Sequence, residues 1–191
     1  MPSDEPVFSE AQLRDRDRLK RLMLYIAWKE ATDPRFGETK FNKLLFFANA
    51  FCLGDNGKPL THFKFQRNTR GPTLRVFERL RDELVNEGRA FVQVTGFSNQ
   101  QFRLVPKNKP QISDFTSEEI AIIDAVIDRF SDDTGTGVSE FSHKYPAWKV
   151  LKNGDDIDPE SVFVIYRNLS ERELLYAVSI APKHGGAGPR T

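Results

Sequence analysis

The chain has 191 residues, of which 39% are apolar and 29% are charged, and its net charge is +1. This composition is typical of one soluble globular domain, and the near-neutral charge gives no general electrostatic case for nucleic-acid or membrane binding. The single cysteine, Cys52, excludes an internal disulfide and favours a reducing compartment. The N-terminus lacks a signal-peptide pattern, and the longest apolar run, residues 44–53, is too short to span a bilayer. We therefore expect a cytoplasmic protein.

The first half of the chain is predicted to be helical. Ser9 begins a capping-box pattern that opens the first helix. Residues 39–53 form a second helix that is apolar around most of its circumference, so we expect it to be the most buried element. Pro72 is expected at the first position of a third helix, where no amide donor is needed, and Gly88 is expected to end that helix.

The second half begins with two β-prone runs that predict a hairpin over residues 90–105. Thr116 then opens a capping-box helix, and a short helix is expected over residues 138–143. Residues 161–166 indicate a short strand and residues 170–180 a last helix. Three apolar hairpin side chains are expected to cover the helices: Phe91, Phe102 and Leu104. The predicted fold class is mainly α (α+β), a compact helical domain of about six helices with one small antiparallel β-hairpin and a short C-terminal strand.

Catalytic motifs are absent from the sequence. The three histidines are far apart, and no HExxH, CxxC or phosphate-binding glycine loop is present. Cys52 falls on the apolar face of a helix, where a core thiol is the expected role. We therefore expect that the protein is not an enzyme and binds neither a metal nor a cofactor.

The segment between Lys58 and Arg89 is rich in basic residues. Helix, helix and hairpin follow one another here, which is also the order of a winged-helix DNA reader. In that alternative, residues 73–86 would be the recognition helix and residues 97–100 the tip of the wing. Four acidic residues within 78–87 dilute the positive charge, which favours an ordinary solvated helix face of mixed charge. DNA binding stays an open alternative at this stage.

Two short segments suggest binding roles beside simpler structural ones. Gly71 and Pro72 would place a helix N-terminus beside Arg70, an arrangement that suits an anionic group, although a plain loop-to-helix junction has the same pattern. His143 and Trp148 flank a proline turn. They are expected to form a packed corner, with a partner contact as the alternative, because tryptophan is a favoured interface anchor.

The same segments resemble the Panacea domain of SocA-like antitoxins. The run TKFNKLLFFANAFCLGDNGKPL resembles the opening motif of that family, and RGP at residues 70–72 resembles its central Gly-Pro step. SEFSHKYPAW resembles the segment that ends in His and Pro-Trp, although Ala147 separates the proline from the tryptophan here. The closing segment, residues 157–177, also matches in order and spacing, with Asp158-Pro159 in place of the usual Pro-Tyr.

The resemblance implies a phage-associated antitoxin that binds and neutralises a toxin encoded beside it in a toxin–antitoxin system. Some relatives act as adaptors that deliver the toxin to the ClpXP protease. The residues predict a flexible tail (1–8), an N-terminal helical extension (9–38) and a disordered tail (182–191), and the resemblance implies a Panacea domain over residues 39–181. The expected partner-binding residues are Lys40, Lys43, Phe47, Arg70, Gly71, Pro72, His143 and Trp148.

Overall fold

The computed structural model of the protein describes residues 10–96 and 100–163. The described helices are α1 (Glu10–Lys29), α2 (Glu38–Asn56), α3 (Phe77–Asn86), α4 (Ser117–Arg129), α5 (Gly135–Ser142) and α6 (Pro146–Val150). The described strands are β1 (Phe65–Gln66), β2 (Thr73–Leu74), β3 (Ala90–Thr95), β4 (Gln101–Pro106) and β5 (Asp156–Ile157), followed by a 3-10 helix, Pro159–Phe163. The mainly helical fold with a small β-component is confirmed.

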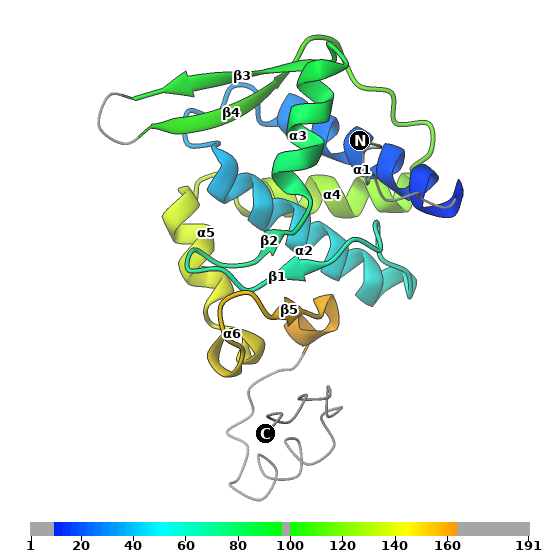
Figure 1. Cartoon of the computed structure of the whole chain (residues 1–191). Helices are drawn as coiled ribbons and strands as arrows, with labels where there is room; N and C mark the ends of the chain where they lie inside the picture. The colour runs from blue at the N-terminus through cyan, green and yellow to red at the C-terminus, as the bar shows by residue number, and fades with distance from the viewer. Residues whose placement is uncertain (1–9, 97–99, 164–191) are drawn as a thin grey trace, which may run out of the picture.

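Helix α2 runs through the middle of the molecule, and the other helices lie around it (Figure 1). Of its 19 residues, 12 are buried, which confirms that it is the central element. Phe47 is fully buried and packs against Phe130 at 5.2 Å and Phe141 at 5.5 Å between ring centroids. The helix ends where Gly57 adopts a left-handed backbone with φ +69°.

Local capping signals placed two helix ends correctly. The hydroxyl of Thr116 accepts a hydrogen bond from the amide of Glu119, and the Glu119 carboxylate accepts one from the amide of Thr116, which confirms the capping box. Gly88 has φ +71°, and its amide donates a hydrogen bond to the carbonyl of Val85. The amide of Arg89 donates a hydrogen bond to the carbonyl of Leu84. This pair of bonds is the Schellman arrangement that a glycine after a helix favours.

The strands form two small antiparallel sheets. Strand β1 pairs with β2 on one side and with β5 on the other, so the chain before α3 is joined to the chain after α6. Strands β3 and β4 form the predicted hairpin, with Val92 opposite Leu104 and Val94 opposite Phe102. Among the residues described, no helix is long and apolar enough to cross a membrane.

The hairpin covers the helices with fewer side chains than predicted. Leu104 is buried as expected, but Phe91 is 45% exposed and Phe102 is 40% exposed. Phe91 pairs with Val105 and therefore lies on the opposite face of the ribbon from Leu104. Phe102 shares the inner face, but it lies two pairs nearer the free end of the hairpin, which extends beyond the helices (Figure 1).

The predicted start of the third helix at Pro72 is wrong. The chain after Pro72 forms β2, and α3 begins only at Phe77. The amide of Leu74 donates to the side-chain oxygen of Asn42 at 3.0 Å, and the amide of Arg75 donates to the carbonyl of Lys64 at 3.0 Å. These partners from distant segments hold the chain in an extended form where the local sequence favoured a helix.

The predicted strand over residues 161–166 is also wrong for the part that the structure describes. Pro159–Phe163 is a 3-10 helix, which begins where the Asp158 carboxylate accepts a hydrogen bond from the amide of Glu160. The short C-terminal strand is β5, which precedes this turn. The predicted Ser9 cap, the last helix over 170–180 and both tails lie outside the described residues.

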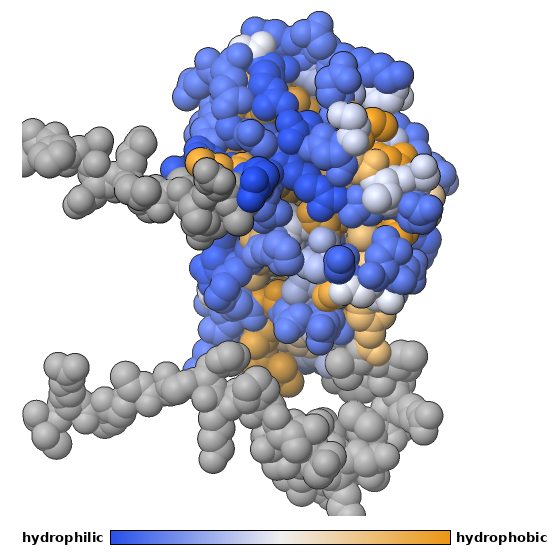
Figure 2. All heavy atoms as spheres, turned by 90° about the vertical axis from the view of Figure 1, so that its right-hand side faces the viewer, coloured by the Kyte–Doolittle hydropathy of each residue, from blue (hydrophilic) through white to orange (hydrophobic). Residues whose placement is uncertain are grey.

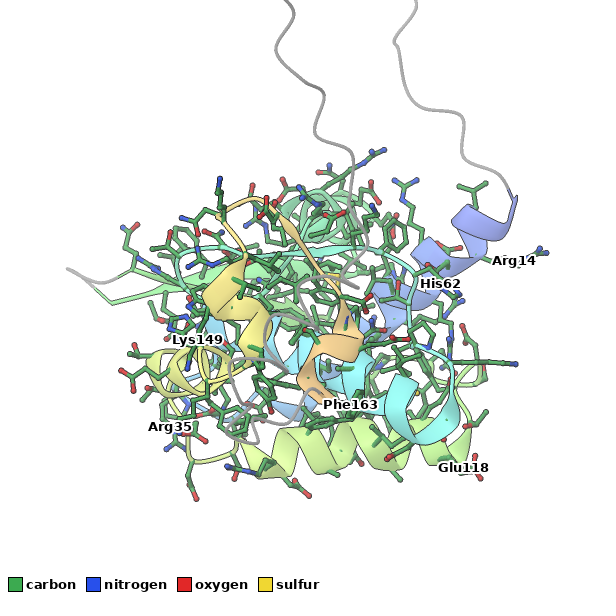
Figure 3. All side chains as sticks on the ribbon, turned by 90° about the horizontal axis from the view of Figure 1, so that it is seen from below. Arg14, Arg35, His62, Glu118, Lys149 and Phe163 are labelled. Carbon is green, nitrogen blue, oxygen red and sulfur yellow. The ribbon has the colours of Figure 1, made fainter. Side chains whose placement is uncertain are left out.

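The surface is largely polar. Figure 2 shows one face that is mostly hydrophilic, with apolar residues in small separate patches. Seen from below, Arg14 and Glu118 point away from the body of the molecule (Figure 3). Phe163 lies beside the end of α2, where its ring centroid is 6.4 Å from that of Phe51.

Candidate functional site

Helix α2 carries buried polar side chains within its apolar surface. Two of them, both asparagines, hold neighbouring backbone in place. The side-chain oxygen of Asn49 accepts a hydrogen bond from the amide of Thr61 at 2.9 Å, and that of Asn42 accepts one from the amide of Leu74. Both asparagines therefore have a structural role. The other two buried polar side chains are lysines, Lys40 and Lys43.

Lys40 is fully buried and fully paired. Its ammonium lies 2.6 Å from a carboxylate oxygen of Asp33 and 3.2 Å from one of Glu30. Burial would raise the pKa of Asp33, but hydrogen bonds from Lys40 and Arg35 outweigh it and lower that pKa to about 2. For Glu30, burial is the larger effect and raises its pKa despite the charge of Lys40. This network joins the end of α1 to the start of α2.

Lys43 lies three residues further along α2 and has no such network. Its side chain is 1% exposed, yet it has no hydrogen bond and no ion pair with any residue that the structure describes. Burial lowers the pKa of its ammonium to about 7, and the nearby charge of Arg70 contributes to the same shift. The protonated form of Lys43 therefore lowers stability, because no described group compensates its buried charge.

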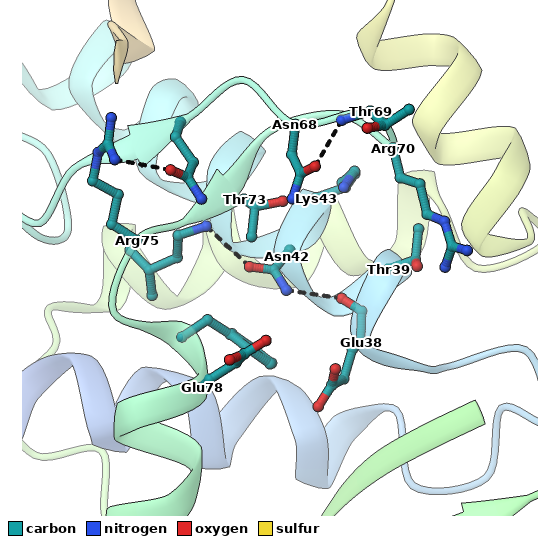
Figure 4. A pocket seen from close by; sticks show the side chains of 13 residues that line it. Glu38, Thr39, Asn42, Lys43, Asn68, Thr69, Arg70, Thr73, Arg75 and Glu78 are labelled. Carbon is teal, nitrogen blue, oxygen red and sulfur yellow. Dashed lines mark hydrogen bonds between the residues drawn. The ribbon is translucent and has the colours of Figure 1, made fainter. Parts of the chain in front are cut away.

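Lys43 forms part of the wall of a polar pocket of about 460 Å³. Figure 4 shows the side chain pointing from α2 toward the loop that carries Asn68, Thr69 and Arg70. Hydrogen-bonding side chains surround it. The lining residues are Glu38, Thr39, Asn42, Lys43, Gln66, Asn68, Thr69, Arg70, Thr73, Leu74, Arg75, Phe77 and Glu78.

Gly71 allows this loop to lie directly on Lys43. It has φ +98°, and an added Cβ would lie 2.5 Å from Cε of Lys43 and 2.6 Å from the hydroxyl oxygen of Ser142. The hydroxyl of Ser139 donates a hydrogen bond to the carbonyl of Arg70, which ties the loop to α5. Only glycine fits here without displacing its neighbours, because both the backbone angle and the space exclude a side chain.

His143 and Trp148 form the predicted corner on the other side of Lys43. Their rings are stacked with centroids 3.9 Å apart, and the Arg67 guanidinium lies 4.1 Å from the Trp148 ring. Burial lowers the pKa of His143, and the charges of Lys43 and Arg67 lower it further. The Nε2 atom of His143 is buried without a hydrogen-bond partner among the described residues.

A second, wider pocket of about 1070 Å³ adjoins the first. It lies between the hairpin and α5, with Phe102 and His143 among its lining residues. The two pockets share Glu38, Thr39, Thr69 and Arg70. Together they form one continuous concave surface.

The structure brings together some of the expected site residues and separates others. Lys43, Arg70, Gly71 and His143 meet at this concave surface, and Trp148 stacks on His143. Lys40, Phe47 and Pro72 are buried in the structural core instead. Sequence reasoning missed Asn42, Ser139 and Ser142. For Asn42 a signal existed, because an asparagine within an otherwise apolar helix usually needs a buried partner.

The basic residues of the DNA-binding alternative are largely neutralised. Arg75 lies 2.6 Å from Asp156, Arg79 lies 3.2 Å from Glu83, and Arg81 lies 2.5 Å from Glu38. The predicted recognition helix also lacks its first turn, because residues 73–76 are not helical. Both observations weaken that alternative. In the described part of the chain, no group of three or more His, Cys, Asp or Glu side chains could hold a metal ion.

The chain matches the model of a known protein family. The family model described as antitoxin SocA-like, Panacea domain, matches residues 41–149, which is more than half of the chain. The matched segment includes most of α2, all of α3 to α5 and the residues that meet at the concave surface. Neither a search of curated proteins nor a search of solved structures found a match.

Proposed function

We propose that this chain binds and neutralises a protein toxin in the cytoplasm, because it belongs to the family of SocA-like antitoxins with a Panacea domain. The family match over residues 41–149 is the observation that carries this proposal. The mechanism is non-catalytic: the antitoxin covers the surface through which the toxin acts. Such a complex depends on a few buried anchor residues surrounded by weaker contacts.

We propose that the wider pocket, with the hairpin face above it, is the toxin-binding face. Phe102 is 40% exposed and Val94 is 50% exposed, and the two pair across the hairpin on the face that carries Leu104. An exposed apolar pair next to a polar, hollowed surface has the composition of an interface core with its rim. Arg70 lies on the border of both pockets and supplies a charge for orientation.

Co-expression with the product of the adjacent gene tests the function. We expect the neighbouring protein to arrest growth alone, to be harmless with this chain and to co-purify with it in moderate salt. The salt tolerance follows because desolvated apolar contacts carry most of the binding energy. If the neighbouring protein is not toxic, or stays toxic in the presence of this chain, the proposal is wrong.

Two hairpin variants test the proposed face. Phe102→Ser removes an exposed ring above the pocket, and we expect loss of rescue and of co-purification. Phe91→Ser is the matched control, because Phe91 is 45% exposed on the opposite face of the same hairpin. Full rescue and co-purification with Phe102→Ser would place the interface elsewhere and leave the antitoxin function intact, and equal loss with both variants would contradict an interface confined to the Phe102 face.

The same rescue assay separates simple occlusion from delivery to ClpXP. In cells that lack this protease, an occluding antitoxin still protects, whereas an adaptor does not. We propose occlusion, and persistence of the toxin at unchanged levels in rescued cells is the expected result. A fall in toxin level that depends on ClpXP would assign the adaptor mechanism.

A further inference from the structure

The cation at Lys43 is the unexplained feature of this fold. A buried charged group is normally paired, because an unpaired one loses its hydration without compensation. The side chain of Lys43 is 1% exposed and lies in the wall of the 460 Å³ pocket, but no described residue pairs with it. The fold therefore buries an amine without a described partner in the wall of this pocket.

A second cation lines the same pocket: Arg70, from the loop, interacts electrostatically with Lys43. His143, which follows α5, interacts electrostatically with Lys43, Arg67 and Glu140, although neither His143 nor Arg67 lines this pocket. The loop cation, Arg70, is exposed and has no ion pair among the described residues. The two cations Lys43 and Arg70 repel each other, so a negative charge between them would relieve the repulsion.

The carboxylates of this pocket do not supply that negative charge. Glu38 is paired with Arg81 at 2.5 Å. Figure 4 shows Glu38 and Glu78 on the side of the pocket away from the loop that carries Asn68 and Thr69, whereas Lys43 points toward that loop. The labelled pocket residues of that loop are Asn68, Thr69 and Arg70, and none of them is acidic (Figure 4).

We propose that this end of the pocket is a binding site for an oxyanion, a carboxylate or phosphate group, held by the ammonium of Lys43 and the guanidinium of Arg70. Charge-assisted hydrogen bonds from both cations would hold the oxyanion. The side-chain amide of Asn68 and the hydroxyl of Thr69 line the same end and can complete its coordination. Gly71 keeps the loop close enough to Lys43 for both cations to reach one group.

This site makes oxyanion binding dependent on pH. Burial and the neighbouring cations lower the pKa of Lys43 to about 7, so the free protein loses this proton near neutrality. A bound oxyanion favours the charged form and raises the pKa again. By linkage, the affinity for an oxyanion falls about tenfold for each pH unit above the pKa of the free protein.

Sulfate is the direct probe, because it stays fully ionised over the whole pH range. We expect a titration of the Lys43 Cε resonance in lysine-labelled protein to have its midpoint near 7 without sulfate. At saturating sulfate and constant ionic strength, the midpoint should rise by roughly one unit or more. Lys64, a lysine with a 71% exposed side chain, is the internal control and should not respond. The proposal is overturned if saturating sulfate leaves the midpoint of the Lys43 titration unchanged.

Three variants separate a binding role from a structural one. Lys43→Met and Arg70→Ala should each weaken sulfate binding at least about tenfold while the fold is retained. Arg75→Ala is the matched control, because Arg75 lines the same pocket but lies 2.6 Å from Asp156. Equal loss of binding in all three variants would indicate general electrostatic attraction and would contradict a built site.

Two further ligands identify the source of the oxyanion. Acetate represents a side-chain carboxylate of a protein partner, and inorganic phosphate represents a phosphorylated small molecule. Tighter binding of phosphate assigns a phosphate ligand, and acetate binding that is equal or tighter assigns a carboxylate. These measurements use the isolated protein, so their failure would not affect the proposed antitoxin function, and failure of toxin rescue would not affect this site.

Discussion

The two buried lysines of α2 lie three residues apart in very different surroundings. Lys40 has two carboxylates within 3.2 Å, from Glu30 and Asp33. Lys43 is buried to the same degree without a partner among the described residues, and it faces a pocket that a loop with Arg70 closes. One helix therefore carries one lysine that forms ion pairs within the fold and one that has no charged partner among the described residues.

The difference shows how to separate structural from functional charge in a small fold. Removing one partner of a buried ion pair leaves the other charge uncompensated, so a paired lysine is required for stability. A buried lysine without a partner lowers stability, so its presence calls for a ligand. Burial alone does not distinguish these two cases, and only the partners do.

Removal of the paired lysine should have the largest effect. Lys40→Met leaves the carboxylates of Glu30 and Asp33 buried without their cation. We expect the free energy of unfolding at pH 7 to fall by roughly 3–5 kcal/mol, as for other broken buried pairs. Urea denaturation followed by circular dichroism measures this. A loss below about 1 kcal/mol, as for an exposed pair, would remove the contrast between the two lysines.

The loop glycine should have the next largest effect. Gly71→Ala introduces a Cβ at φ +98° that would lie 2.5 Å from Cε of Lys43. The strained backbone and the displaced neighbours together should cost roughly 2–4 kcal/mol. Gly57→Ala is the control, because Gly57 has φ +69° with no atom within 4 Å of an added Cβ, and its cost should be about 1 kcal/mol. Equal costs would show that the loop does not pack tightly on Lys43.

The pH dependence of stability should differ between wild type and Lys43→Met. The pKa of Lys43 falls from 10.5 to about 7 on folding, so between these values the unfolded chain binds the extra proton. Stability conferred by this group is therefore lowest below pH 7 and rises by about 1.4 kcal/mol per pH unit up to about 10.5. Denaturant titrations at several pH values should show that the free energy of unfolding of wild type rises relative to that of the variant as the pH increases. Parallel curves would mean that folding does not lower the pKa of Lys43.

Cys52 should have the smallest effect. It is fully buried on α2, and burial raises the pKa of its thiol. A soluble thiol reagent at pH 8 should leave the folded protein unlabelled and should label it only after unfolding in denaturant. Rapid labelling without denaturant would show that α2 opens more readily than its burial implies.

Local signals in the sequence predicted the parts of the fold that depend on neighbouring residues. The capping box at Thr116, the glycine after α3 and the apolar circumference of α2 each act within a few residues. The start of α3 was predicted wrongly, because Asn42 and strand β1 hold residues 73–74 in an extended form. No pattern near Pro72 contains that information.

The candidate site was only partly predictable for the same reason. The family resemblance singled out both lysines, and the two positions look equivalent in the sequence. The turn after α1 brings Glu30 and Asp33 to Lys40, whereas Gly71, from a loop nearly thirty residues away, covers Lys43. Such a difference depends on tertiary packing and becomes visible only when the partners are in place.

The most direct test of this account compares Lys40→Met and Lys43→Met at pH 6 without added oxyanions. Both substitutions keep an unbranched side chain that is one heavy atom shorter, and both remove its charge. We expect Lys40→Met to be strongly destabilised and Lys43→Met to be at least as stable as wild type, because the second change removes an unpaired buried cation. If Lys43→Met loses as much stability as Lys40→Met, both lysines are structural and the account is contradicted.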